Sequence, residues 1–388
     1  MAKTLYACGF NGFAQLTGFQ SQIREGWLVE PKSQSDKKLD TTVSITYPIT
    51  IGQLAEAVLL KSVIFTWSRI ATNLQKDGNH LCLIVGRVER DTDSSLCSSF
   101  DEEAVCATDA HILLQGDQDR SKFSCLCDGD VQSQPLVLKK EEQTNSKPIR
   151  LHASHKDIYY SQGSIEFGKL THAEPEIKMK SNFINSGAFH LLPIDMSVKI
   201  ATVSCGREHV LLLSSFGCVY SCGLGSRGQL GHGDVEMEQT PRLVEALEGV
   251  RMLSCQAGGW HSASVSECGD LYTWGWNESG QLGLGCLSAS QETDGQVKHQ
   301  DVDAIPGLVT EPQCAVFPGD IVVKAVACGS RHTVALSDCG QVFCCGWNAY
   351  GQLGLKHKIN QSGFVQMTSL DSTCTQIFAG HWCSMFLC

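Results

Sequence analysis

Short apolar runs alternate with polar, glycine-containing turns along the second half of the chain. Residues 204–233, 254–285 and 327–355 share one order of positions: a histidine, an apolar run, a glycine turn, a second apolar run and a Gly-Gln-Leu motif. Short runs rich in Val, Leu, Phe, Tyr and Trp between glycine turns are typical of β-hairpins. The pattern therefore predicts one hairpin in each segment, and no 3.6-residue helical period competes with this interpretation.

The spacing indicates that these hairpins belong to an internal repeat. Each histidine precedes the turn glycine by 8 residues, and that glycine precedes the Gly-Gln-Leu glycine by 11. The Pro-bearing segment 238–255 between two copies is long enough for outer strands and a return. A repeat of about 50 residues with several strands fits a blade of a β-propeller. The three sets are His209, Gly217 and Gly228; His261, Gly269 and Gly280; and His332, Gly340 and Gly351.

The repeated polar residues have structural explanations in such a blade. Glycine permits positive φ or a close backbone approach at the inner turns. The glutamine that follows can satisfy backbone groups of the turn. We expect each histidine to hydrogen-bond to the neighbouring blade; the alternative is a metal site around a central channel. The residues assigned to these structural roles are Gly228, Gly280, Gly351, Gln229, Gln281, Gln352, His209, His261 and His332.

The cysteines near these motifs do not form a recognisable metal site. Those that precede the histidines, Cys205, Cys255 and Cys328, are interpreted as small buried residues of the inner strand. The pairs Cys125-Leu-Cys127 and Cys344-Cys345 lack the Cys-x-x-Cys spacing of zinc sites. We therefore expect neither a metal nor another cofactor.

Three motifs together resemble the repeat of the regulator of chromosome condensation family: Cys-Gly-x-x-His, Gly-x-Val-Tyr and Trp-Gly-x-Asn-x-x-Gly-Gln-Leu-Gly. The resemblance is specific for residues 201–388 and weak for 40–200. The run GGWHSASVSECGDLYTWGWNESGQLG at 258–283 is most similar to a small member with a single propeller. The resemblance implies an all-β, seven-bladed β-propeller that occupies residues 1–388 as one domain.

The two ends of the chain look like two halves of one repeat. GHWCSMFL near the C-terminus aligns with GSRHTVAL, which places Cys383 at a histidine position. The missing half is at the N-terminus, where Cys8-Gly9-Phe10-Asn11 aligns with 274–277. We therefore expect residues 1–18 and 374–388 to share a blade that closes the ring, because closure removes an exposed sheet edge.

The region 60–200 is interpreted as degenerate blades with a long insertion at 128–197. Residues 104–125 repeat the inner hairpin with His111 at the histidine position, and 62–86 do so more loosely around Asp77-Gly78. Residues 201–373 hold the three clear repeats. With the shared blade, six blades are supported by the residues themselves. The family implies a seventh, for which the open alternatives are segments 128–200 and 20–60.

Composition limits the class of protein. A chain of 388 residues that is 42% hydrophobic can bury a large core, as two domains or as one closed repeat. No apolar run of about 18 residues and no secretory signal occur, so we expect a soluble, intracellular protein whose 20 cysteines are mostly free thiols. The net charge of −11 argues against direct DNA binding.

Three segments interrupt the period and are candidates for docking loops: 87–103, 128–197 and the acidic stretch 286–322. The last contains six acidic residues, among them Asp301 and Asp303, against one lysine. Solvated loops without a partner are the alternative interpretation.

No phosphate loop, Gly-x-Ser-x-Gly elbow or His-Glu-x-x-His motif occurs, so we expect no catalytic residues and no enzyme activity. The resemblance implies a monomeric, nuclear, chromosome-associated interaction propeller, with a cytosolic pool as an alternative. It further implies a chromatin adaptor that acts with a JmjC-type 2-oxoglutarate-dependent oxygenase or with histones, in histone methylation state and chromosome segregation. The alternative is guanine-nucleotide exchange on a Ran-like small GTPase. The candidate partner-binding residues are Arg207, Glu208, Trp260, Arg331, Tyr350, Asp301 and Asp303.

Overall fold

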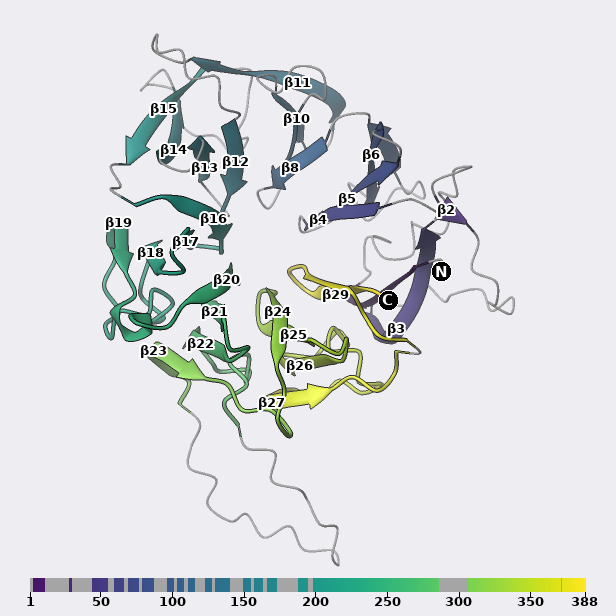
Figure 1. Cartoon of the computed structure of the whole chain (residues 1–388). Helices are drawn as coiled ribbons and strands as arrows, with labels where there is room; N and C mark the ends of the chain where they lie inside the picture. Colours follow the sequence, from purple (N-terminus) through teal and green to yellow (C-terminus); the bar gives the residue numbers. More distant parts are fainter. Residues whose placement is uncertain are drawn as a thin grey trace, which may run out of the picture.

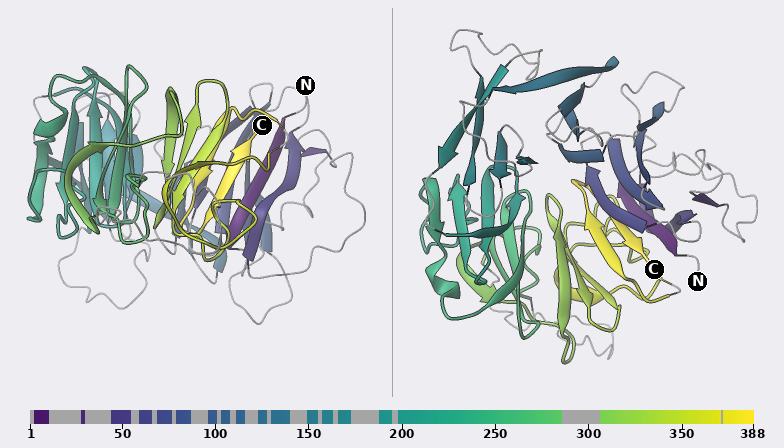
Figure 2. Two further views of the ribbon diagram at one scale, coloured as in Figure 1. Left: turned by 90° about the horizontal axis from the view of Figure 1, so that it is seen from below. Right: turned by 45° about the horizontal axis from the view of Figure 1, so that its top comes forward.

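The computed structural model describes residues 3–10, 198–285, 306–370 and 372–388, together with the strands between residues 28 and 194 and the neighbouring Ser154 and Asp157. The described part is all-β: it contains strands, one short 3₁₀ turn at Glu245–Leu247 and no α-helix. The sheets are arranged around a central axis, and the two chain ends lie close together (Figure 1). Figure 2 shows the sheets side by side with their strands running in similar directions.

Three four-stranded antiparallel sheets form the second half of the chain, one from each clear repeat. Their strands pair in chain order from the central axis outwards. The first sheet holds β16 (Ile200–Cys205), β17 (His209–Ser214), β18 (Val219–Gly223) and β19 (Glu238–Leu243). The second holds β20 (Met252–Ala257), β21 (His261–Ser266), β22 (Leu271–Trp276) and β23 (Leu308–Cys314). The third holds β24 (Val323–Cys328), β25 (His332–Ser337), β26 (Val342–Gly346) and β27 (Gln361–Gln366).

The second strand of each repeat is buried along its whole length. All residues of β17, β21 and β25 are buried, because each sheet packs against a neighbour on both faces. The core consequently lies between sheets: Leu211 and Leu213 of one sheet pack with Trp274 of the next, whose indole is fully buried. This arrangement explains the continuous apolar run of β17, Val210 to Leu213, and the burial of the serines of β21.

Strands from both ends of the chain share one sheet. Its order is β2-β3-β1-β29-β28, formed by β1 (Thr4–Phe10), β2 (Leu28–Val29), β3 (Ser44–Leu54), β28 (Gln376–Ala379) and β29 (Cys383–Leu387). β1 runs antiparallel to β29, with Leu5 opposite Leu387 and Gly9 opposite Cys383. A Cys374–Cys388 disulfide links the segment before β28 to the last residue, whereas Cys8 of β1 and Cys383 of β29 in the same sheet are free thiols.

Cys8 takes the structural place of Trp274 and Cys345 in the complete repeats. The Cys8 thiol donates to the carbonyl oxygen of Gln352 at 3.3 Å. The Trp274 indole and the Cys345 thiol donate in the same way to the carbonyls of Gln229 and Gln281. The alignment of the N-terminal residues with the end of a repeat strand therefore has a direct counterpart in these contacts.

The first half forms two further sheets. One has β4 (Leu59–Phe65), β5 (Arg69–Lys76), β6 (Asn79–Gly86) and β7 (Leu96–Phe100), so β5 and β6 flank the predicted Asp77-Gly78 turn. The other has eight strands, β8 (Glu103–Ala107), β9 (His111–Gln115), β10 (Phe123–Cys127), β11 (Asp130–Lys139), β12 (Ile149–Ala153), β13 (Ile158–Gln162), β14 (Glu166–His172) and β15 (Ala188–Ile194).

The segments that interrupt the sequence period are not simply loops. Residues 128–197 hold the five strands β11 to β15, so the prediction of one long insertion there is wrong. β7 lies within 87–103, and β23 lies within 286–322. The strands in these segments carry none of the repeated glycine and histidine motifs. Without these repeated positions the strands cannot be recognised in the sequence, and the segments that contain them look like insertions.

Gly275 illustrates why glycine recurs at the end of the third strand. Its φ is +103°, and a Cβ there would lie 2.7 Å from the carbonyl oxygen of Trp260 and 3.2 Å from Gln229 Cα. Replacement by any other residue therefore combines an unfavourable φ with a backbone clash.

We expect Gly275→Ala to lower the free energy of unfolding by about 3 kcal/mol, as measured by urea denaturation. Gly249→Ala is the matched control, since Gly249 has φ +86° but no atom within 4 Å of the added Cβ. The control should lose only about 1 kcal/mol. Equal losses in the two variants would show that the close contact between neighbouring repeats has no energetic importance.

Candidate functional site

A row of stacked arginines and tryptophans crosses one face of the propeller. The Arg207 guanidinium lies 5.1 Å from the Trp260 ring centroid, and that of Arg227 lies 5.2 Å from the same ring. Arg227 and Arg331 lie 4.4 and 4.3 Å from the Trp276 ring. We call Arg207, Trp260, Arg227, Trp276 and Arg331 the arginine–tryptophan ladder.

Turns at the same end of successive sheets build the ladder. Arg207 follows the innermost strand β16, and Trp260 follows the equivalent strand β20. Arg227 belongs to the Gly-Gln-Leu turn of one repeat and reaches the tryptophans of the next. Trp260 and Trp276 meet edge to face at 5.5 Å, which fixes the spacing of the row.

Glu208, in the turn that follows β16, holds the Trp260 ring of the ladder in place. The Trp260 Nε1 donates a hydrogen bond of 3.0 Å to a Glu208 carboxylate oxygen. Burial lowers the pKa of Arg331, as does the nearby Arg227, while Glu278 acts in the opposite direction. The Nε of Arg331 is buried without a hydrogen-bond partner among the described residues. Arg331 is therefore the partly buried end of the ladder, with Arg227 and Glu278 as its charged neighbours.

A second aromatic cluster continues in the same direction. The Trp347 ring lies 4.9 Å from Trp382 and 5.1 Å from Tyr350. The contact of Trp347 with Trp382 is equivalent to that of Trp276 with Arg331, one repeat further on. The sequence-predicted Tyr350 therefore lies in this cluster.

A cavity of about 240 Å³ opens on the axis beside the ladder. The carboxyl ends of the inner strands β12, β16, β20, β24 and β28 line it. Arg207 belongs to both the ladder and the cavity, and Ser154, Ser330 and His381 add polar groups. Cys205 and Cys328 also face the cavity and are only half-buried, whereas Cys255 is buried as predicted.

The three repeated histidines are buried and link neighbouring sheets. His209, His261 and His332 lie within 2.8–3.0 Å of the hydroxyls of Ser262, Thr333 and Ser384 in the next sheet. These hydroxyls donate in turn to the main-chain carbonyls of the repeated glutamines, Gln229, Gln281 and Gln352.

This chain of hydrogen bonds, from histidine to hydroxyl to carbonyl, determines which ring nitrogen of each histidine carries the proton. Each hydroxyl has one hydrogen, which it gives to a carbonyl, so the histidine Nε2 must be the donor to the hydroxyl oxygen. The Nδ1 atoms of the three histidines are buried and have no partner among the described residues. Burial therefore lowers their pKa values, to about 3 for His209 and His261 and about 4 for His332. Neutral histidines of this kind hold sheets together.

The repeated glutamines hold their own turns. The Oε1 atoms of Gln229, Gln281 and Gln352 accept hydrogen bonds from the main-chain N–H two residues earlier, at 2.8–3.1 Å. The side chains are fully buried. Their Oε1 atoms therefore stabilise the turns, and the buried side chains cannot contact a partner.

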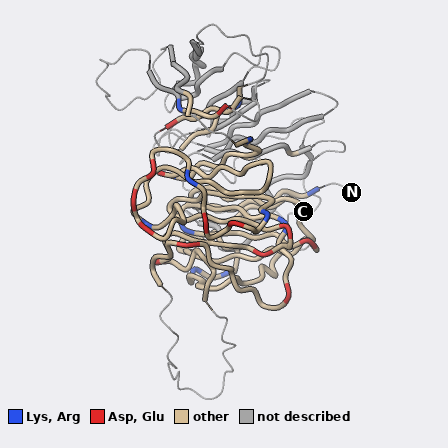
Figure 3. The backbone as a smooth tube through the Cα atoms, turned by 60° about the vertical axis from the view of Figure 1, so that its left-hand side comes forward, with Lys and Arg blue, Asp and Glu red and all other residues tan. Residues whose placement is uncertain are grey.

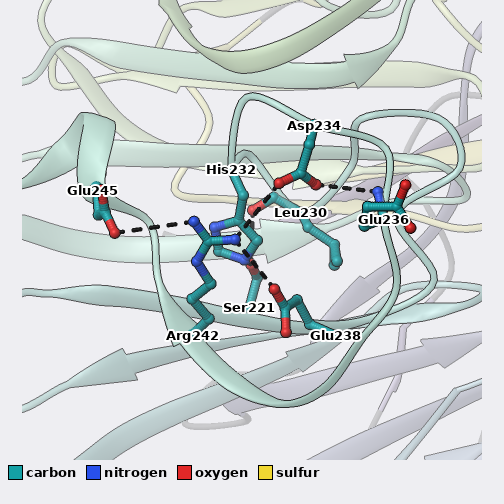
Figure 4. A network of polar contacts seen from close by, with 8 residues as sticks. All are labelled: Ser221, Leu230, His232, Asp234, Glu236, Glu238, Arg242 and Glu245. Atoms are coloured by element: carbon teal, nitrogen blue, oxygen red, sulfur yellow. Dashed lines mark hydrogen bonds and ion pairs between the residues drawn. The ribbon is translucent and has the colours of Figure 1, made fainter.

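A polar network around Arg242 contrasts with the ladder (Figure 4). The Arg242 guanidinium contacts the carboxylates of Asp234, Glu238 and Glu245. The hydrogen bond to Glu238 and the nearby carboxylates raise its pKa. This arginine is engaged by acidic groups of its own sheet, whereas the guanidiniums of the ladder stack on rings of the neighbouring one.

The structure brings four of the predicted partner-binding residues together: Arg207, Glu208, Trp260 and Arg331. Asp301 and Asp303 lie outside the described residues. Sequence reasoning missed Arg227 and Trp382. The available signal for Arg227 was its position directly before the Gly-Gln-Leu turn, next to the turns that hold Trp276 and Trp347.

Within the described ranges, no group of three or more His, Cys, Asp or Glu side chains could hold a metal ion. None of the helical segments described there is long and apolar enough to cross a membrane.

Two family models of the regulator of chromosome condensation (RCC1) repeat match the chain. One matches residues 217–265, 268–336 and 339–387, and the other matches 200–229 and 323–352. RCC1 domain-containing protein 1 from Mus musculus is 40% identical over 199 residues, which cover 47% of this chain and 50% of that protein. Its Homo sapiens counterpart is 38% identical over 212 residues, or 50% and 55% of the two chains. This chain thus spans about half the length of these curated relatives.

A solved structure extends the likeness to the whole chain. Prp20p from Saccharomyces cerevisiae, which was studied for its binding to Gsp1p and histones, aligns with a TM-score of 0.67 over 100% of this chain and 91% of that chain. The sequence identity is 16%, so this likeness concerns the fold alone. The chain therefore has the propeller fold of RCC1 proteins, and its second half is built from repeats of the RCC1 family.

Proposed function

We propose that this chain is a non-catalytic β-propeller that binds protein partners through the face that carries the arginine–tryptophan ladder. The observation that carries the proposal is the stacking of three guanidiniums on two indoles across neighbouring repeats, beside an axial cavity. Planar guanidiniums held in this way are preorganised for bidentate recognition of carboxylates. Rigid aromatic and arginine groups are also the types that dominate the energetics of protein interfaces.

The proposed architecture is one domain of seven blades, closed by the blade that residues 1–18 and 374–388 share. The eight-stranded sheet divides at the parallel pair β11–β15 into two units of four strands. When these two units are counted separately, the six sheets correspond to seven blades of the proposed ring. The Gln376 side chain of the shared sheet also lies 3.5 Å from the carbonyl oxygen of Leu60 in β4, which supports closure between the first and last units.

The proposed role is that of a chromatin-associated adaptor in the nucleus. The RCC1 repeats and the similarity to RCC1 domain-containing protein 1 support a complex with a JmjC-type oxygenase, with histones, or with both. In that complex the propeller would influence histone methylation state and chromosome segregation. The likeness to Prp20p, a protein tested for histone binding, supports the histone part.

The same likeness favours a second candidate function. Prp20p was also tested for binding to Gsp1p, and the founding member of the family exchanges guanine nucleotide on a Ran-like GTPase. Exchange on a Ran-like small GTPase by this chain is therefore the alternative.

Affinity purification from nuclear extract with mass spectrometry distinguishes the two functions. We expect the full chain to recover a JmjC-type oxygenase or histones and to cause no release of labelled GDP from a Ran-like GTPase. Arg207→Ala should reduce recovery at least tenfold, while Arg251→Ala should not. Arg251 is paired with Glu267 at the other end of β20, which makes it a matched surface control.

Recovery of a small GTPase with accelerated GDP release would overturn the adaptor function. A third bait that lacks residues 287–305 tests the acidic stretch without removing β23. Loss of histones from this bait alone would assign their recovery to the acidic stretch.

A further inference from the structure

The Cys374–Cys388 disulfide lies where three segments of the chain meet. The N–H of Cys374 donates a 2.9 Å hydrogen bond to the carbonyl oxygen of Gly340, in the turn between β25 and β26 of the third repeat. The N–H and C=O of Cys388 are both hydrogen-bonded to Thr4 of β1. Figure 3 shows from a further side that the two chain ends lie close together. The disulfide therefore ties the segment that contacts the third repeat to the strand that pairs with β1.

One hydrophobic core lies beneath this junction. Cys374 is 4% exposed and belongs to a core that also contains Val342 of β26, Cys8 of β1 and Phe386 of β29. Cys388 packs against the same core but is only partly buried. A cross-link between residues 14 positions apart restricts the unfolded segment and so stabilises the native packing of these strands. Without the cross-link, the strands are held by hydrogen bonds and packing alone.

The two cysteines of the disulfide differ in their exposure to solvent. Cys374 is buried, whereas Cys388 is partly exposed. An external thiolate therefore attacks the Cys388 sulfur, forms a mixed disulfide with it and expels Cys374 as a thiolate, which takes up a proton. A second thiolate attacks the external sulfur of the mixed disulfide and expels Cys388, which is protonated in turn. The protein disulfide thus gains two electrons and two protons, and two external thiols become one external disulfide.

Buried thiols nearby do not take part in this exchange. Cys8, Cys344 and Cys383 are free and buried, and burial raises their pKa values. The thiolate is the reactive form of cysteine, so these three thiols remain protonated and unreactive. Cys339, in the turn between β25 and β26, is exposed. It is therefore the alternative pairing partner that a test has to exclude.

We propose that the Cys374–Cys388 disulfide is a redox latch, which a low-molecular-weight thiol–disulfide couple such as glutathione opens and closes. The oxidised latch holds the shared sheet, with strands β1, β28 and β29, against the sheet of the third repeat. The reduced latch allows these strands to separate from that sheet more often. The latch regulates the packing of the shared sheet and does not depend on which partner the chain binds.

Redox titration of the full chain tests whether the latch is reversible. Samples are equilibrated at different ratios of reduced to oxidised glutathione, blocked with iodoacetamide and digested, and the linked Cys374–Cys388 peptides are quantified by mass spectrometry. We expect the linked peptides to disappear as reduced glutathione rises and to return, without denaturant, when oxidised glutathione is restored. A link that never forms, that resists reduction in the folded chain, or that joins Cys388 to Cys339 would overturn the proposal.

Hydrogen exchange compares the oxidised and reduced chains. Reduction should speed amide exchange in β1, β28 and β29 by about tenfold or more, and it should leave exchange in β17, which belongs to another sheet, unchanged. The midpoint of thermal unfolding should fall by about 4 °C. Equal exchange in β1, β28 and β29 of the two chains would show that the disulfide has no influence on the packing of the shared sheet.

Two single substitutions assign the response. Cys388→Ser removes the latch at the partly exposed cysteine and leaves the buried Cys374 in place, so the variant should exchange at the reduced rate in both buffers. Cys268→Ser is the matched control, because Cys268 is an exposed free thiol in the turn of the second repeat equivalent to that of Cys339. This control should keep the full redox response. A response that persists in Cys388→Ser, or that is lost in Cys268→Ser, would assign redox sensitivity to another group and overturn the proposal.

Discussion

Deleting residues 1–10 is expected to unfold the chain or to lower its midpoint of thermal unfolding by roughly 10 °C or more. The deletion removes β1, the central strand of the five-stranded sheet, which lies between β3 and β29. Ala7 and Cys8 are completely buried, and Leu5 is 2% exposed. Without β1, the edge of β29 and its buried Phe386 would be open to water. Differential scanning calorimetry measures the effect.

A circular permutant tests whether the lower midpoint comes from the loss of β1 or from the altered chain ends. The N–H and C=O of Thr4 are both hydrogen-bonded to Cys388, at 2.7 and 2.9 Å, so a short glycine linker can join the two ends. New ends placed between residues 287 and 305 leave every described strand intact. The permutant should melt within a few degrees of the original chain. A truncated chain that melts at the original temperature would disprove the importance of the shared sheet.

Lowering the pH from 7.5 to 5 is expected to reduce the free energy of unfolding by about 6 kcal/mol through three buried histidines. Their folded pKa values are about 3 for His209 and His261 and about 4 for His332, below the ordinary value of 6.5. The unfolded chain therefore binds more protons between pH 3 and 6.5, so stability is lost as the pH falls below 6.5. At pH 5 each histidine accounts for about 2 kcal/mol. Urea denaturation at several pH values measures the slope.

His261→Gln identifies the contribution of one histidine. The glutamine amide can donate to Thr333 Oγ1 as the imidazole does, but it takes up no proton. We expect the variant to be less stable at pH 7.5, with a pH dependence reduced by about 1.4 kcal/mol per pH unit between pH 4 and 6. An unchanged slope would mean that other groups, such as the carboxylates, cause the acid sensitivity.

The hairpins of the second half follow directly from the sequence. The fixed distances from His209 to Gly217 and from Gly217 to Gly228 predict two strands and two turns, and β17 and β18 lie where they are expected. Equivalent strands occur in the other two repeats. The prediction succeeds there because turn chemistry and apolar runs are local signals.

The strands that lie outside the repeated hairpins could not be found in this way. β23 lies in a stretch interpreted as an acidic insertion, and β12 to β15 lie in one interpreted as a mixed-charge insertion. The burial pattern of β23 is mostly intermediate or exposed, so its residues carry little apolar signal. The pairing of β11 with β15 is parallel and links distant residues, which no local pattern encodes.

The sequence by itself determined the repeat, its hairpins, the buried roles suggested for the histidines and the similarity of the two chain ends to two halves of one unit. It also singled out Arg207, Trp260 and Arg331. Only the tertiary structure decided that Arg227 of one repeat stacks between Trp260 and Trp276 of the next, and that Cys205 and Cys328 face an axial cavity. Such contacts depend on how neighbouring sheets are placed side by side, and sheet placement is set by packing between residues about 50 positions apart rather than by any local pattern.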